Sequence, residues 1–159
     1  MVCKFISTQL NGLNIDNFRL ISGGSLIFYI GIRESKTQMT EWRLHVEPAW
    51  RLTKSGTFII GSLDTIEIDE KNLQSVENNL ANLRPLVGIA IEDVKVSESI
   101  PDLELYFNNG YVFTTFAHSM DGECWELRNA DGRRWGMGAA NELREWREPS
   151  DIDIKCSSS

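Results

Sequence analysis

The feature that most constrains the fold is the alternation of apolar and polar residues in several short segments. In residues 41–47, Trp42, Leu44 and Val46 alternate with ionisable side chains. Successive side chains of a β-strand point to opposite faces, so this pattern predicts a strand with one face buried and the other in solvent. Pro48 follows and ends the strand. The chain is therefore predicted to consist mainly of β-structure.

Turn residues separate several of these segments from a second strand-like segment. Asparagine, aspartate and glycine tolerate the left-handed backbone that tight turns need, so each pair is predicted to form an antiparallel hairpin. The predicted turns are 54–56, 108–110 and 130–132. Residues 25–32 are apolar on both faces, which is typical of a central, well-covered strand. At Glu92-Asp93 the inward side chains change parity, which predicts a β-bulge, or else two short strands.

One segment has the spacing of a helix. We predict a helix over about residues 70–83, capped by Asp69 or Thr65, ended by Pro85 and packed on the sheet. Its apolar residues recur at steps of three or four and are Leu73, Val76, Leu80 and Leu83. A second, short and charged helix is predicted over residues 141–148.

The predicted fold class is α+β: a mostly antiparallel sheet built from hairpins, with the helix 70–83 packed on it. Residues 1–150 are expected to form a single domain and residues 151–159 a flexible tail. Residues 20–64 and 87–138 share an order of features: an apolar strand, a Trp-x-Leu motif, a glycine turn and a strand ending in glycine. Either an internal repeat or the general pattern of hairpins explains this likeness.

Acidic residues gather in the middle of the chain. Residues 61–108 hold ten acidic and three basic side chains, whereas residues 1–60 hold seven basic and four acidic ones, within a net charge of −7. Binding to nucleic acid requires a dense basic surface, so we expect no nucleic-acid partner. An acidic surface suits a basic protein partner. Alternatively, the acidic excess only keeps the protein soluble.

The tryptophans divide by position. Trp42, Trp125 and Trp135 have inward parity and are predicted to lie in the core, whereas Trp50 and Trp146 are expected to be partly exposed. An exposed tryptophan beside an arginine is typical of an interface. The predicted protein-binding residues are therefore Asp64, Glu67, Asp69, Glu70, Glu92, Asp93 and Trp50.

Residues with the chemistry of catalysis are few. Only His45 and His118 titrate near neutral pH by default. His118, Ser119 and Asp121 lie in one loop, but the members of a catalytic triad normally come together through the fold. We therefore predict no catalytic residue, no metal ligand and no cofactor.

The cysteines and hydropathy indicate the compartment. Cys3, Cys124 and Cys156 are odd in number and far apart, which predicts free thiols rather than disulfides or a metal site. No segment approaches the roughly 20 apolar residues of a membrane helix, and no secretory signal follows Met1. The expected location is the cytoplasm, with no membrane partner.

The motif Glu123-x-Trp125-x-Leu127, followed by Asp131-Gly132, resembles an uncharacterised family of small bacterial β-rich domains. By analogy, some small acidic bacterial proteins of this build are immunity proteins for secreted toxins. We expect a non-catalytic protein-binding module, in its finer form an immunity-type protein that binds a basic toxin through an acidic face. The alternative is a small enzyme or ligand-binding barrel with a pocket near the loop of His118. A homodimer is a further alternative.

Overall fold

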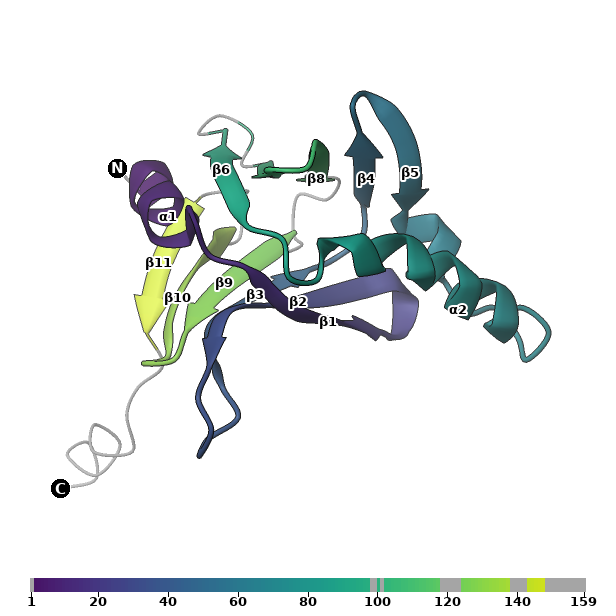
Figure 1. The fold of residues 1–159 in the computed structure, drawn as a ribbon, viewed down its shortest axis with the longest axis horizontal. Helices are drawn as coiled ribbons and strands as arrows, with labels where there is room; N and C mark the ends of the chain where they lie inside the picture. The colour runs from purple at the N-terminus through teal and green to yellow at the C-terminus, as the bar shows by residue number, and fades with distance from the viewer. Residues whose placement is uncertain (1, 98–99, 101, 118–123, 138–142, 148–159) are drawn as a thin grey trace, which may run out of the picture.

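The computed structural model describes residues 2–97, 100, 102–117, 124–137 and 143–147. They form two antiparallel sheets, one six-stranded in the order β1-β2-β3-β9-β10-β11 and one five-stranded in the order β5-β4-β8-β7-β6 (Figure 1). Two α-helices accompany the sheets. The α+β class with mostly antiparallel strands is thus confirmed. No helix in the described ranges is long and apolar enough to cross a membrane.

The elements have the following bounds. The six-stranded sheet consists of β1 (Ile15–Ile21), β2 (Ser25–Arg33), β3 (Thr40–Val46), β9 (Trp125–Asn129), β10 (Arg133–Met137) and β11 (Leu143–Arg147). The five-stranded sheet consists of β4 (Trp50–Lys54), β5 (Thr57–Gly61), β6 (Ile91–Val96), β7 (Leu103–Phe107) and β8 (Tyr111–Thr115). The helices are α1 (Val2–Leu10), α2 (Leu73–Leu80) and the 3₁₀ helices η1 (Ser22–Gly24), η2 (Ser62–Thr65) and η3 (Ala81–Leu86).

The core lies between the two sheets. The inward residues of β3, predicted from the alternation, are all buried, and so are the inward residues of β9. Phe28 of β2 meets Phe113 of β8 edge to face, with ring centroids 4.9 Å apart, which joins one sheet to the other. On the six-stranded sheet, Trp42 and Trp135 are 5.3 Å apart, and Phe5 of α1 packs on Trp135. Aromatic pairs of this kind contribute about 0.5–1.5 kcal/mol beyond the area they bury.

The predicted hairpins β4–β5, β7–β8 and β9–β10 are all present. β2 lies between β1 and β3, so its predicted central place is confirmed. Its second face is not well covered, however: Ile27 and Tyr29 are half-buried and Ile32 is 78% exposed. The pairing of β6 with β7 shifts register between Ile91 and Asp93, which confirms the bulge at Glu92-Asp93. Alternation along the chain therefore predicted both the strands and their turns.

The two sheets share one arrangement. Each contains three consecutive strands, β1–β3 or β6–β8, extended by a hairpin from the other half of the chain: β9–β10 joins β3, and β4–β5 joins β8. β3 and β9, which carry the two compared Trp-x-Leu motifs, are neighbours in one sheet. Strands of residues 20–64 and 87–138 are thus interleaved in a single body, and an internal repeat remains a prediction.

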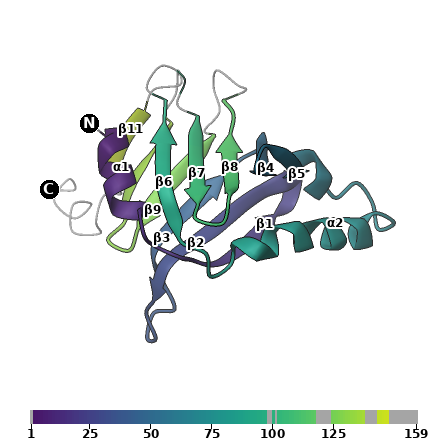
Figure 2. The ribbon, with the colours of Figure 1, turned by 45° about the horizontal axis from the view of Figure 1, so that its top comes forward.

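The helix predicted over residues 70–83 begins later in the structure. α2 starts after Asn72, whose side-chain oxygen accepts from the backbone N–H groups of Ile68 and Asp69. Asp69 instead accepts from the N–H of Lys71, so it does not cap the helix. The chain passes Pro85 within η3, a 3₁₀ extension of the helix. Figure 2 shows α2 reaching past the edge of the sheets. In its first turn, Leu73, Gln74 and Ser75 are exposed, whereas Val76 is buried.

The ends of the chain differ most from the prediction. Residues 143–147 form β11, paired along its whole length with β10, and not the predicted helix over 141–148. Isolated helices this short are marginal, whereas the ladder to β10 satisfies backbone hydrogen bonds. The helix α1 and the strand β1 were not predicted. The predicted tail, residues 151–159, and Cys156 lie outside the described residues.

Candidate functional site

The predicted acidic residues fall into two groups. Asp64, Glu67, Asp69 and Glu70 lie in η2 and in the segment that leads from β5 to α2. Glu92 and Asp93 lie on β6. β5 and β6 are the two edges of the five-stranded sheet, about 19 Å apart at the usual strand spacing. The six residues therefore do not gather at one edge of the sheet.

The first group lies among exposed apolar side chains. Leu63 and Ile68 are 81% and 82% exposed, and Phe58 and Leu73 are 60% and 40% exposed. We call these four residues, together with Asp64, Glu67, Asp69 and Glu70, the acidic end. Single exposed apolar residues are ordinary, but several exposed within one short part of the chain are typical of a protein-binding surface. The exposure of Leu73 was not predictable from its helical spacing, which indicates a buried side chain.

Hydrogen bonds hold the backbone of the acidic end. The Asp64 carboxylate accepts from the Gly61 N–H at 2.9 Å, and Asn79 of α2 donates to the Asp64 carbonyl at 2.9 Å. Asp64 and Asp69 thus stabilise local turns. No hydrogen bond or ion pair involving the side chains of Glu67 and Glu70 is found among the described residues. These two carboxylates remain available for a partner.

In the second group, Glu92 and Asp93, one carboxylate has a structural role. Asp93 accepts from the Ser7 hydroxyl at 3.4 Å and from the Val94 N–H at 2.9 Å, so it links β6 to α1. Glu92 is exposed on the edge strand. Of this pair, Glu92 is exposed and Asp93 is half-buried.

Trp50 is not partly exposed, as the sequence analysis expected, but 2% exposed. It opens β4 with its indole between the sheets, stacked on Phe113 at 5.4 Å, and Nε1 donates to the Gly24 carbonyl at 2.8 Å. The bend after Pro48 turns this side chain inward, in step with Leu52. Trp50 therefore belongs to the core and is not at the surface of the predicted binding face.

Of the residues considered for catalysis, His45 is the one that the structure describes. His45 faces outward, with Nε2 3.2 Å from a carboxylate oxygen of Glu47. His118, and with it the pocket predicted near its loop, lies outside the described residues, as does the side chain of Trp146. In the described part of the chain, no three histidine, cysteine or acidic side chains gather as metal ligands would.

One titratable group on the five-stranded sheet is perturbed. The Tyr106 hydroxyl donates to Glu104 at 2.6 Å, and this hydrogen bond, with burial and the negative charge of Glu104, raises the pKa of Tyr106. Lys95, whose Nζ lies 4.5 Å from the ring centroid, counters the shift. Because Tyr106 holds its proton more firmly than usual, it is not activated as a base.

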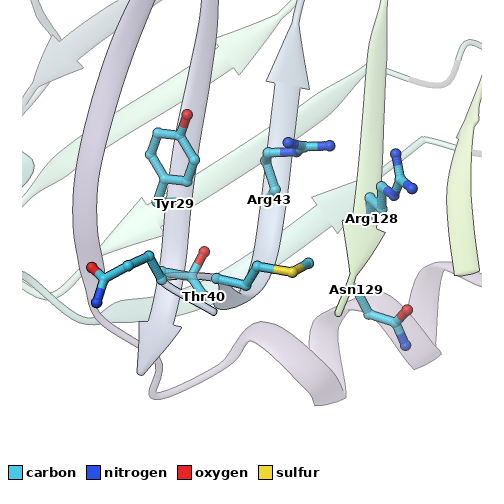
Figure 3. A pocket seen from close by; sticks show the side chains of 7 residues that line it. Tyr29, Thr40, Arg43, Arg128 and Asn129 are labelled. Carbon is cyan, nitrogen blue, oxygen red and sulfur yellow. The ribbon is translucent and has the colours of Figure 1, made fainter. Parts of the chain in front are cut away.

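A pocket of about 370 Å³ lies on the outer face of the six-stranded sheet. Figure 3 shows Tyr29, Arg43 and Arg128 on three neighbouring strands of its wall. The alternation in residues 41–47 predicts that Arg43 points outward. Only the pairing of β3 with β9 brings Arg128, 85 residues further along the chain, beside it. Single-strand patterns do not contain that information.

Comparison of the chain with protein-family models, curated proteins and solved structures finds no match. The chemistry of its surfaces is therefore the basis for a functional argument. Two surfaces stand out: the acidic end, with carboxylates among exposed apolar groups, and the pocket beside Arg43.

Proposed function

We propose that this protein is a non-catalytic protein-binding module that binds a basic partner protein through its acidic end. The observation that supports this is the exposure of Leu63 and Ile68, both more than four-fifths accessible, next to the carboxylates of Glu67 and Glu70. In its finer form, the proposal is an immunity-type protein that acts in the cytoplasm and neutralises a basic toxin.

The two kinds of side chain have different roles in this proposal. Burying a leucine or isoleucine side chain against a partner contributes about 1.5–3 kcal/mol each, so Leu63 and Ile68 supply affinity. Carboxylates steer a basic protein toward the surface and set its orientation. Because Glu67 and Glu70 are exposed, their carboxylates stay hydrated in the free protein. The free-energy cost of desolvating them arises only when the partner binds.

The test uses charge reversal at residues without a local structural role. The variant Glu67→Lys/Glu70→Lys keeps the hydrogen bonds of Asp64 and Asp69. Each protein is immobilised and exposed to lysate of its native cells at low ionic strength. We expect a basic protein that the wild type retains, that the variant loses, and that elutes when salt is raised, because screening weakens charge-driven association.

The matched control is Glu34→Lys/Asp131→Lys, which reverses two exposed charges in hairpin loops away from the acidic end. It should retain the partner as the wild type does. Retention by Glu67→Lys/Glu70→Lys, or equal loss in the control, would contradict binding through the acidic end. Binding that does not weaken with salt would contradict a charge-driven association.

A further inference from the structure

A second pocket lies where the start of β1, the end of β2 and the segment between η3 and β6 meet. Its volume is about 510 Å³, and residues 12–16, 31–32 and 87–88 line it together with Glu41 of β3. Ligand sites for small molecules usually have volumes of about 300–1,000 Å³. The pocket is therefore large enough for a small organic molecule.

Backbone hydrogen bonds between these segments fix the walls of the pocket. The Gly31 N–H donates to the Asn14 carbonyl at 2.9 Å, and the Gly88 N–H donates to the Ile15 carbonyl at 2.7 Å. The Ile15 N–H donates in turn to the Ile89 carbonyl at 3.1 Å. The walls are thus in place without a ligand, and a ligand does not have to order them.

Glu41 presents a carboxylate in a fixed position on one wall. The pairing of β2 with β3 shifts register between Ile30 and Arg33, and in this gap the Glu41 side chain lies over Gly31. One carboxylate oxygen, Oε2, accepts from the Ile32 N–H at 2.7 Å. Gly31 has a φ of 85°, and a Cβ there would overlap with the carboxylate. Among the described residues, no group donates a hydrogen bond to the other oxygen, Oε1.

The pocket carries a negative charge. None of the described residues that line it is basic. Asp16, which also lines the pocket, is neutralised by Arg33, whose guanidinium nitrogen lies 2.6 Å from the carboxylate. Glu41 has no such partner in the described part of the chain, because no basic side chain there lies within 4.0 Å of its carboxylate. One uncompensated negative charge therefore faces the pocket.

Apolar side chains form much of the remaining wall. Leu13 is half-buried, Val87 is 40% exposed and Ile32 is 78% exposed. Covering such side chains with an apolar group removes their surface from water, which is favourable. The pocket thus combines one carboxylate with an apolar surface that the fold leaves uncovered.

We propose that this pocket binds a small organic cation, a primary ammonium group that carries an alkyl chain. The ammonium group donates to Oε1 of Glu41 in a charge-assisted hydrogen bond. A guanidinium group pairs best with both oxygens of a carboxylate, but Ile32 already occupies Oε2, so the compact ammonium fits better. The alkyl chain covers Leu13 and Val87. The proposal does not depend on the acidic end, which lies elsewhere in the chain.

The test is an NMR titration of the whole ¹⁵N-labelled protein with hexylammonium chloride. We expect saturable shifts of the Ile32 and Gly88 backbone N–H signals. Butylammonium, which is two methylenes shorter, should bind roughly tenfold more weakly, since each buried methylene contributes to affinity. Hexan-1-ol, which lacks the charge, should bind at least about tenfold more weakly than hexylammonium.

The variant Glu41→Gln removes the charge but keeps an oxygen that can accept from the Ile32 N–H. It should weaken hexylammonium binding about tenfold or more, because the hydrogen bond to the ligand loses its charge. The matched control is Glu77→Gln, which removes an exposed carboxylate from α2, outside the pocket. It should change the affinity less than twofold. Thermal melting of both variants shows whether the fold is retained.

Four results would overturn the proposal. They are the absence of saturable shifts with hexylammonium, binding of hexan-1-ol as tight as that of hexylammonium, full affinity in Glu41→Gln, and an equal loss in Glu77→Gln. The last result would mean that the cation is attracted by the net charge of the protein and not by this pocket.

Discussion

The row of Tyr29, Arg43 and Arg128 and the acidic end are built by different means. Backbone pairing across three strands fixes the positions of the residues in this row. The acidic end consists of short helices and a connecting segment, held by a few hydrogen bonds such as that from Asn79 to the Asp64 carbonyl. Paired strands suit a surface of fixed geometry. A segment with exposed apolar side chains suits the broader surface of a protein.

The largest expected effect tests the core that supports both regions. Trp50→Ala should lower the free energy of unfolding by about 3–5 kcal/mol, because it empties space between the sheets. It also removes the hydrogen bond to Gly24 and the packing on Phe113. Chemical denaturation measures the change. A decrease in the free energy of unfolding of less than about 1 kcal/mol would indicate a partly exposed Trp50, as its sequence position predicted.

Two glycines sharpen the contrast between a tight sheet and an open end. A Cβ at Gly136 of β10 would lie 2.5 Å from the Trp125 carbonyl oxygen, whereas at Gly61 its nearest neighbour is the Phe58 ring at 3.4 Å. Gly136→Ala should cost about 1–3 kcal/mol, since β9 and β10 must separate.

Gly61→Ala is the matched change near the acidic end. It should alter stability by less than about 0.5 kcal/mol, as is usual away from tight packing. Denaturation curves of both variants give the comparison. Equal costs at Gly61 and Gly136 would mean that the two regions are equally tightly packed.

Within the acidic end, the carboxylates should separate by role. Asp64→Ala should cost about 0.5–1 kcal/mol, because it removes the acceptor for the Gly61 N–H at the start of η2. Glu67→Ala should leave stability nearly unchanged. Chemical denaturation of the two single variants measures the free energy of unfolding of each. A larger decrease for Glu67→Ala than for Asp64→Ala would contradict the roles assigned to the two carboxylates.

Local patterns predicted what depends on neighbours in the chain. Alternation identified the inward residues of β3 and β9, and turn residues identified the hairpins. The order of strands depends on contacts between distant residues, so the pairing of Arg43 with Arg128 was not predictable. Trp50 shows the same limit. Its place in a bend after Pro48 predicts an exposed side chain, but in the structure the indole is buried between the two sheets. The charge pattern identified the acidic segment. The exposure of Leu63 and Ile68 was not predictable, because it depends on which side chains the folded chain covers.

The most direct test of the central claim is cross-linking at zero length. A carbodiimide joins a carboxylate to a lysine that it touches, so treatment of native lysate followed by mass spectrometry reports which carboxylates meet a partner. We predict cross-links from Glu67 or Glu70 to lysines of one basic protein. Partner cross-links confined to other carboxylates, such as Glu34 or Asp131, would contradict the account.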